Sequence, residues 1–191
     1  MPAITIVGVA ESIERELRGR LAGNPLAVVV VGCGEQPTGP FLEISQETWQ
    51  ATIAALRSAF RAAQAAAAEL VGGGHPGRVV MLVPTASLRP VHGAALLATA
   101  GGFLTTIGQV GAAELGPAGV TVNVVAHGWL EGAPAALIDG VPVGRLTRPA
   151  DIAGAVSYLA SEEAAYVNGA VLAVDGGFWI TKTAGGSPLG R

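Results

Sequence analysis

One stretch near the carboxyl end, residues 144–177, constrains the fold more than any other part of the sequence. Pro149 and Asp151 predict the first turn of a helix, because proline suits that turn and a carboxylate there meets the positive end of the helix dipole. Apolar residues then recur at three- and four-residue spacing, which gives the helix one apolar face; they are Ile152, Ala155, Val156 and Leu159. A tight bend at 168–169 and an apolar strand over 170–174 follow. A helix that leads back into a buried strand is the repeating unit of α/β folds.

The composition agrees with such a fold. With 191 residues, half of them apolar, 13% charged and 28 of them glycine, the chain suits one doubly wound α/β domain with buried parallel strands. A net charge of −3 without a basic run argues against nucleic acid and membrane surfaces as partners. The single Cys33 offers no disulfide and no paired metal ligands, so we expect no metal site and a reducing cytoplasm as the location. The apolar run at the amino end is too short for a signal sequence or a membrane span.

The order and spacing of three motifs resemble the short-chain dehydrogenase/reductase (SDR) family. These motifs cover residues 148–153, 159–169 and 171–177, and the resemblance extends from Ile4 to Phe178. It implies a Rossmann-like, doubly wound parallel sheet, with a single domain over residues 1–178 and a tail over 179–191. The chain passes from its first helix, residues 11–21, almost directly to an apolar strand at 26–31, where the family has two further strand units. We therefore expect about five strands, lacking the family's second and third strand units, with one right-handed crossover between the first two.

The first strand–helix turn of the family carries three glycines that approach a cofactor pyrophosphate. Gly8 remains here, whereas Ser12 and Glu14 stand at the other two places. A side chain at the third place hinders close approach, and its carboxylate repels phosphate. A simpler interpretation makes Glu14 a helix-stabilising acid in the first turn. Either way, and with the adenosine units absent, the resemblance predicts that this chain binds no cofactor and that NAD(P) is held by a partner subunit.

Catalysis in the family depends on an Asn, a Ser, and a Tyr followed four residues later by a Lys. The Tyr exchanges a proton with the substrate carbonyl while the cofactor supplies hydride. The matching places here are all apolar: Leu56, Pro84, Leu96 and Ala100. The loss does not depend on the alignment, since Lys182 is the sole lysine and neither Tyr158 nor Tyr166 precedes a lysine by four residues. We predict that the chain is not an enzyme by itself.

Few candidates for residual chemistry remain. His127 follows a strand at the expected carboxyl edge of the sheet, and Thr85 and Ser87 lie near the place of the family's serine. The sequence shows no nucleophile paired with His127, so these three are weak catalytic candidates. The buried, structural interpretation of Cys33 is favoured over a reactive thiol.

The elements used for assembly in the family persist in pattern. They are two long helices, at about 46–71 and 92–116, which form the main dimer interface in relatives. Glycines in the second helix allow close packing either against another chain or against the chain's own sheet. The leading hypothesis is a pseudoenzyme subunit that pairs with an active SDR paralogue, as a heterodimer or heterotetramer, in an NAD(P)-dependent oxidoreductase acting on ketoacyl or hydroxyacyl substrates. The alternatives are a small atypical reductase and a homo-oligomeric scaffold or ligand-binding module.

Overall fold

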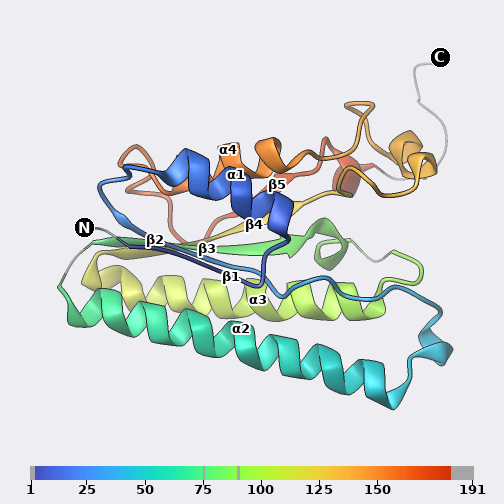
Figure 1. Cartoon of the computed structure of the whole chain (residues 1–191), viewed down its shortest axis with the longest axis horizontal. Helices are drawn as coiled ribbons and strands as arrows, with labels where there is room; N and C mark the ends of the chain where they lie inside the picture. The colour runs from blue at the N-terminus through green and yellow to red at the C-terminus, as the bar shows by residue number, and fades with distance from the viewer. Residues whose placement is uncertain (1–2, 75, 90, 182–191) are drawn as a thin grey trace.

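The protein is a three-layer α/β sandwich, seen in a computed structural model that describes residues 3–74, 76–89 and 91–181 (Figure 1). Five parallel strands pair in the order β1-β2-β3-β4-β5. Their bounds are Ile4–Val7, Ala27–Val31, Gly77–Pro84, Val120–His127 and Val171–Val174. The predicted doubly wound sheet of about five strands is confirmed.

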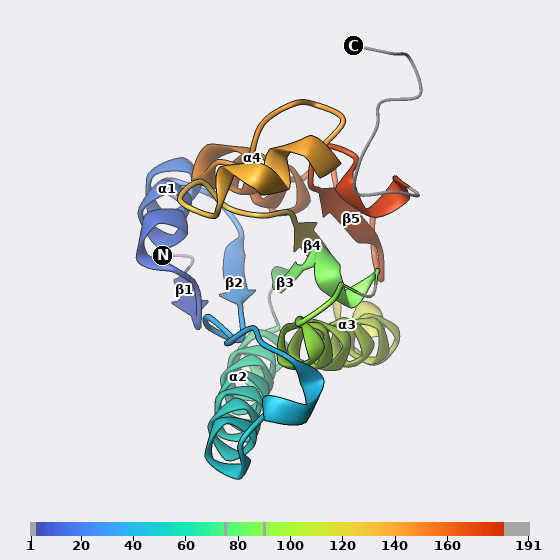
Figure 2. The same cartoon turned by 90° about the vertical axis from the view of Figure 1, so that its right-hand side faces the viewer.

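Two helices cover each face of the sheet (Figure 2). α1 (Glu11–Leu21) and α4 (Pro149–Leu159) lie on one face, and α2 (Gln46–Gly72) and α3 (Ala95–Leu115) lie on the other. Each face has its own apolar core: Leu17 of α1 clusters with Ile152 of α4, and Leu104 of α3 with Leu56 of α2. β3 is buried along its whole length, as a parallel strand covered on both faces must be.

The connections between strands do not all have the same hand. Strand order follows chain order, yet α1 and α4 lie on the face opposite to α2 and α3 (Figure 2). With the carboxyl ends of the strands toward the viewer, the connections through α2 and α3 are right-handed and those through α1 and α4 are left-handed. The predicted right-handed crossover between the first two strands is therefore wrong. The contact between α1 and α4, rather than the preference of an isolated βαβ unit, fixes the face on which α1 lies.

The α4–β5 region has the helix and strand that its sequence pattern predicted, and polar side chains hold it in place. Asp151 accepts a hydrogen bond from the Arg148 N–H at 2.9 Å, which caps the first turn of α4, and its carboxylate receives both guanidinium nitrogens of Arg145 at 2.6 and 3.0 Å. Asn168 accepts from the Val122 N–H at 2.9 Å and donates to the Ala112 carbonyl at 2.8 Å. These bonds join the loop before β5 to β4 and α3.

α3 packs closely on its own chain. A Cβ added at Gly101 would lie 2.6 Å from Cβ of Ser87, and one added at Gly108 would lie 3.1 Å from Cγ of Met81. Of the two interpretations left open for the α3 glycines, these two positions fit packing against the chain's own elements. Residues 95–118 are long and apolar enough to cross a membrane by length and composition alone. Here the segment lies along β3 and β4, and the same composition suits a helix in a protein core.

Candidate functional site

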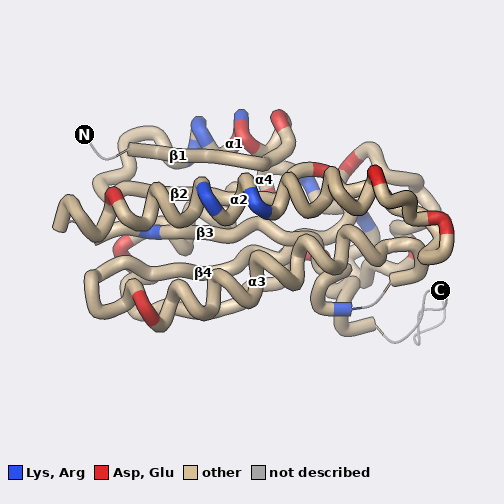
Figure 3. Tube along the Cα trace, turned by 90° about the horizontal axis from the view of Figure 1, so that it is seen from below, with Lys and Arg blue, Asp and Glu red and all other residues tan. Residues whose placement is uncertain are grey.

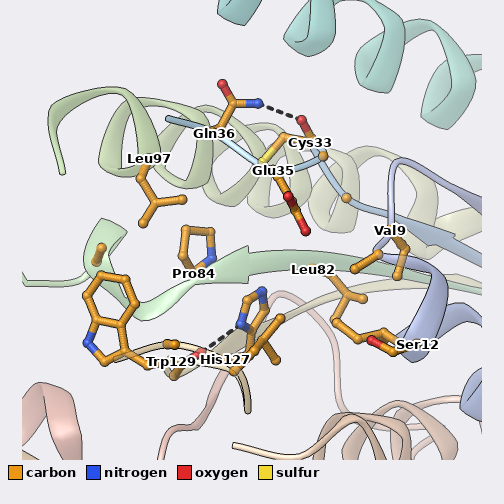
Figure 4. A pocket seen from close by; sticks show the side chains of 18 of the residues that line it. Val9, Ser12, Cys33, Glu35, Gln36, Leu82, Pro84, Leu97, His127 and Trp129 are labelled. Atoms are coloured by element: carbon orange, nitrogen blue, oxygen red, sulfur yellow. Dashed lines mark hydrogen bonds between the residues drawn. The ribbon is translucent and has the colours of Figure 1, made fainter. Parts of the chain in front are cut away.

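The path of the chain opens a cleft at the carboxyl ends of the strands. The chain leaves β1 toward α1 on one face and leaves β2 toward α2 on the other, so the two loops part. The same happens between β3 and β4. Ligands of open α/β sheets bind at such a crevice. The cleft here has a volume of about 600 Å³ and is lined by the loops that follow β1, β2, β3 and β4 (Figure 4).

The β1 side of the cleft keeps part of a phosphate-binding turn. Gly8 has φ +65°, and a Cβ there would lie 2.3 Å from the Gly32 carbonyl oxygen, so the contact between the two loops requires glycine. Ser12 lines the cleft. Glu14 is not among the lining residues, because its carboxylate pairs with Arg18 along α1 at 2.7 Å. Of the two interpretations of Glu14, the helix-stabilising one fits this geometry, and the carboxylate does not block the cleft.

The four places of the family's catalytic residues hold no acid or base. Leu56 and Leu96 are each 3% exposed and Ala100 is fully buried. Leu56 and Ala100 lie in the core between the sheet and the helices α2 and α3. Pro84, at the end of β3, is the one of the four that lines the cleft.

Of the three weak candidates, the structure brings two into the cleft. The His127 ring lies there, and its Nδ1 is 3.0 Å from the Gly128 carbonyl oxygen (Figure 4). Because a carbonyl only accepts, Nδ1 carries the hydrogen and Nε2 keeps a lone pair. Burial lowers the pKa of His127, so the ring is neutral near pH 7. Thr85 also lines the cleft, whereas Ser87 does not and donates to the Pro84 carbonyl at 2.8 Å.

Sequence reasoning missed several lining residues that follow strand ends. Glu35 points its carboxylate into the cleft from the loop after β2, across from His127 (Figure 4). Trp129 lines the cleft, and its buried Nε1 has no hydrogen-bond acceptor among the described residues. Cys33 lies on the same loop as Glu35, and burial raises the pKa of its thiol to about 11, in agreement with the predicted structural role. Position after a β-strand is the one sequence signal that marks Glu35 and Trp129, the two residues that were missed.

The charge of the cleft has one sign. Glu35 and Glu131 contribute carboxylates, and no Lys or Arg of the described residues lines it. The cleft therefore offers acceptors and the first turn of α1, without a fixed cation among the described residues.

Comparison with known proteins identifies the family. The family model described as "Enoyl-(Acyl carrier protein) reductase" matches residues 10–179. The chain belongs to the short-chain dehydrogenase/reductase family. Nodulation protein G of Azospirillum brasilense is 33% identical over 164 residues, covering 81% of this chain and 66% of its own length. The 3-oxoacyl-[acyl-carrier-protein] reductase MabA of Mycobacterium avium is 32% identical, with 81% and 64% covered. This SDR chain thus spans about two thirds of the length of these relatives.

Solved structures share the fold. A putative 2-deoxy-D-gluconate 3-dehydrogenase from Agrobacterium tumefaciens, with bound NADP, matches with a TM-score of 0.76 at 27% identity, covering 88% of this chain and 74% of that chain. The TT0495 protein from Thermus thermophilus matches with a TM-score of 0.83 at 23% identity over 95% of this chain and 100% of that one. The second likeness shows the fold alone, in a solved chain that is covered completely.

These neighbours overturn the expectation that the chain itself holds no cofactor. The Agrobacterium SDR carries bound NADP on a fold that matches 88% of this chain. The expectation gave too much weight to two substitutions in the first turn: Glu14 lies outside the cleft, Ser12 lines it, and Gly8 keeps its left-handed conformation. The absence of cofactor was therefore the wrong conclusion from Ser12 and Glu14.

Proposed function

We propose that this chain is a subunit of an SDR oxidoreductase that binds a nicotinamide nucleotide in its cleft but carries out no chemistry itself. An active SDR paralogue supplies the Ser, Tyr and Lys of the catalytic site. One observation carries the proposal: the fold and the cleft persist, while the four proton-handling places are Leu56, Pro84, Leu96 and Ala100.

The residues present are better suited to binding a nucleotide than to catalysing a reaction. Ser12 and the first turn of α1 would hold phosphate. A bound nicotinamide nucleotide supplies hydride. Reduction of a carbonyl also needs a proton donor at its oxygen, and general acids contribute roughly 10²–10⁴-fold to such rates. Leu96 and Ala100 cannot donate a proton, so this chain orients ligand and excludes water.

An exposed apolar face supports assembly with a second SDR chain. Trp49, Ile53 and Phe60 of α2 are 45%, 42% and 38% exposed, and their spacing places them on one side of the helix. Figure 3 looks onto α2 and α3 and shows charged residues on α2, whose exposed arginines are Arg57 and Arg61. On α3 the only charged residue is Glu114. Exposed aromatic and aliphatic side chains of this kind are typical of interface cores, and Arg57 beside them suits the rim of such an interface.

The substrate and the location are proposed from the relatives. MabA of M. avium is named as a 3-oxoacyl-[acyl-carrier-protein] reductase, and the FabG protein of Escherichia coli, 30% identical over 180 residues, has the same activity in its name. We propose 3-oxoacyl or 3-hydroxyacyl thioesters as substrates of the complex, and the cytoplasm as its compartment.

Co-expression with the full-length SDR paralogues of the host tests the proposal. We expect one paralogue to purify with the tagged chain in equal amount, with an activity that is abolished when the paralogue's catalytic Tyr is replaced by Phe. Trp49→Glu with Ile53→Glu should disrupt the complex. The matched control Val143→Glu, at a 63% exposed residue away from α2, should leave it intact. Failure of every paralogue to form a stable complex would refute the heteromeric role.

A second candidate function rests on the cleft position of His127. Its neutral ring presents a free Nε2 there, so a small reductase that uses His127 is the alternative. That function requires carbonyl reduction by the isolated chain, lost in His127→Phe. The third possibility, a homo-oligomeric scaffold, predicts a stable oligomer of the pure chain in solution and no recovery of a paralogue.

A further inference from the structure

The indole of Trp129, which lines the cleft, is oriented by packing. Its Nε1 has no hydrogen-bond acceptor among the described residues, so none of their polar groups fixes the ring. The ring of Phe178 meets it edge to face, with centroids 6.2 Å apart and an interplanar angle of 77°. Aromatic pairs prefer this geometry. Phe178 does not itself line the cleft, so it acts on the cleft through Trp129.

Arg89 in turn holds Phe178. The Cζ atom of Arg89 lies 5.3 Å from the centroid of the Phe178 ring, within the range of a cation–π contact. Its Nη1 donates to the Phe178 carbonyl at 2.8 Å and to Oγ1 of Thr181 at 3.1 Å. Arg89 forms no salt bridge with any residue that the structure describes. Its charge is therefore directed to the segment that begins at Phe178.

These contacts join three strand ends. Arg89 lies in the segment after β3, Trp129 follows β4, and Phe178 follows β5. The Arg89 N–H donates to the carbonyl of Thr85, which lines the cleft, at 3.2 Å. A Cβ added at Gly140 would lie 3.3 Å from Cε2 of Phe178, so the Phe178 ring has little room to shift. The cleft walls after β3 and β4 are thus connected through a side chain that lies outside the cleft.

We propose that Arg89 is a positioning residue of the cleft: it fixes Phe178, and Phe178 fixes the indole of Trp129 in the cleft wall. Arg89 does not line the cleft and touches no ligand there. Without its guanidinium, the Phe178 and Trp129 rings take several orientations, and a ligand that binds must restrict them at a cost in affinity. The proposal rests on the proposed function only in taking a nicotinamide nucleotide as the ligand.

Tryptophan fluorescence tests the effect on Trp129 without any ligand. Trp49 and Trp179, which are 45% and 42% exposed and do not line the cleft, are replaced by Phe so that Trp129 is the sole tryptophan. We expect Arg89→Ala to shift the emission to longer wavelength and to increase its quenching by acrylamide. Arg89→Lys should restore part of the wild-type signal, because an ammonium group keeps a cation near the Phe178 ring. Arg57→Ala, at an exposed arginine of α2, is the matched control and should change neither property. Unchanged emission and quenching in Arg89→Ala would overturn the proposal.

Calorimetric titration of the full chain with NADH tests the consequence for the cleft, after urea denaturation has confirmed that each variant is folded. We expect Arg89→Ala and Phe178→Leu each to raise the Kd about fivefold. The double variant should raise it by about the same factor, because both changes act through Trp129.

Two results of this titration would overturn the proposal. One is an unchanged Kd in Arg89→Ala, and the other is a double variant weakened by the product of the single effects, about 25-fold. Absence of NADH binding by the wild-type chain would instead refute the proposed nucleotide site, and the fluorescence of Trp129 would then decide the role of Arg89.

Discussion

The β1–α1 region and the α4–β5 region are built from the same kinds of elements but are stabilised differently. α4 begins with a capped first turn, and Asn123, Asn168 and Asp175 tie the segments around β5 to the main chain. α1 has Ala10 at its N-cap position with no side-chain cap, and among the described residues its ion pairs are Arg15–Glu11 and Arg18–Glu14, both within the helix. The β1–α1 region is therefore held mainly by apolar contacts, whereas side-chain hydrogen bonds, most of them partly buried, also hold the α4–β5 region.

The difference also shows that a conspicuous sequence motif need not mark a functional site. The polar residues of the α4–β5 region serve the fold, which explains why its sequence pattern is so readable. The β1–α1 region, which contributes the turn expected to meet phosphate, keeps Gly8 and contributes Ser12 as a polar residue of the cleft lining, while the charged residues of α1 include two pairs within the helix. A family motif can thus persist for structural reasons after the catalytic residues have been replaced.

Leu17→Ala tests whether apolar contacts anchor the β1–α1 region, and it should have the largest effect on stability. Leu17 is fully buried between α1 and α4, so the substitution leaves a cavity and should lower the free energy of unfolding by roughly 3–4 kcal/mol. Urea denaturation measures this, and hydrogen exchange should show α1 opening before β4. A loss below about 1 kcal/mol would mean that α1 is not anchored by this contact.

Asn123→Ala tests the side-chain hydrogen bonds that hold the α4–β5 region. The Asn123 amide donates to the Val167 carbonyl at 2.8 Å and accepts from the Ala170 N–H at 3.0 Å. Two backbone groups lose their partners, so we expect a loss of roughly 2–3 kcal/mol in urea denaturation. Thr99→Val, which removes an exposed hydroxyl bond on α3, serves as the control and should change stability by less than about 0.5 kcal/mol. Equal effects of the two changes would contradict the account.

Asp151→Asn tests how the stability of the α4–β5 region depends on pH. Hydrogen bonds from Arg145 hold the pKa of Asp151 well below its usual range, so the carboxylate stabilises the fold above the unfolded pKa near 4 and loses this effect as pH falls through the folded value. We expect Asp151→Asn to cost about 1 kcal/mol at pH 7. The difference from wild type should shrink as denaturation is repeated at pH values progressively below 4. A difference independent of pH would exclude this role of the carboxylate.

Cys33→Ala should have the smallest effect at neutral pH, about 1 kcal/mol or less. Burial raises the pKa of Cys33 to about 11, so the unfolded chain releases a proton at a lower pH than the folded one. Wild type should therefore lose roughly 1 kcal/mol relative to the variant between pH 8 and pH 9.5. The urea midpoints of the two proteins are measured over this pH range. The same pH dependence of both midpoints would contradict a buried thiol at Cys33.

Much of the fold was predictable because its signals are local. The helix at 149–159 and the strand after the bend at 168–169 follow from a cap, an apolar period and a glycine at φ +75°. The hand of the β1–β2 connection was not predictable, since it depends on the contact of α1 with α4, far away in sequence. Glu14 was ambiguous for the same reason: only the structure shows its carboxylate directed to Arg18.

The candidate site was predictable in what it lacks more than in what it contains. The loss of Tyr and Lys can be read directly from Leu96 and Ala100. Glu35 and Trp129 gave no sequence signal beyond following a strand, because Glu35 lies on the loop after β2 and meets His127 and Trp129, at the end of β4, only in the fold.

Hydride transfer by the purified chain alone, followed as NADH or NADPH oxidation with a 3-oxoacyl thioester, tests the central claim most directly. The account predicts nucleotide binding without turnover above the uncatalysed rate, and turnover only after the active SDR paralogue is added. Turnover by the isolated chain that disappears in His127→Phe would contradict it and establish this chain as a reductase in its own right.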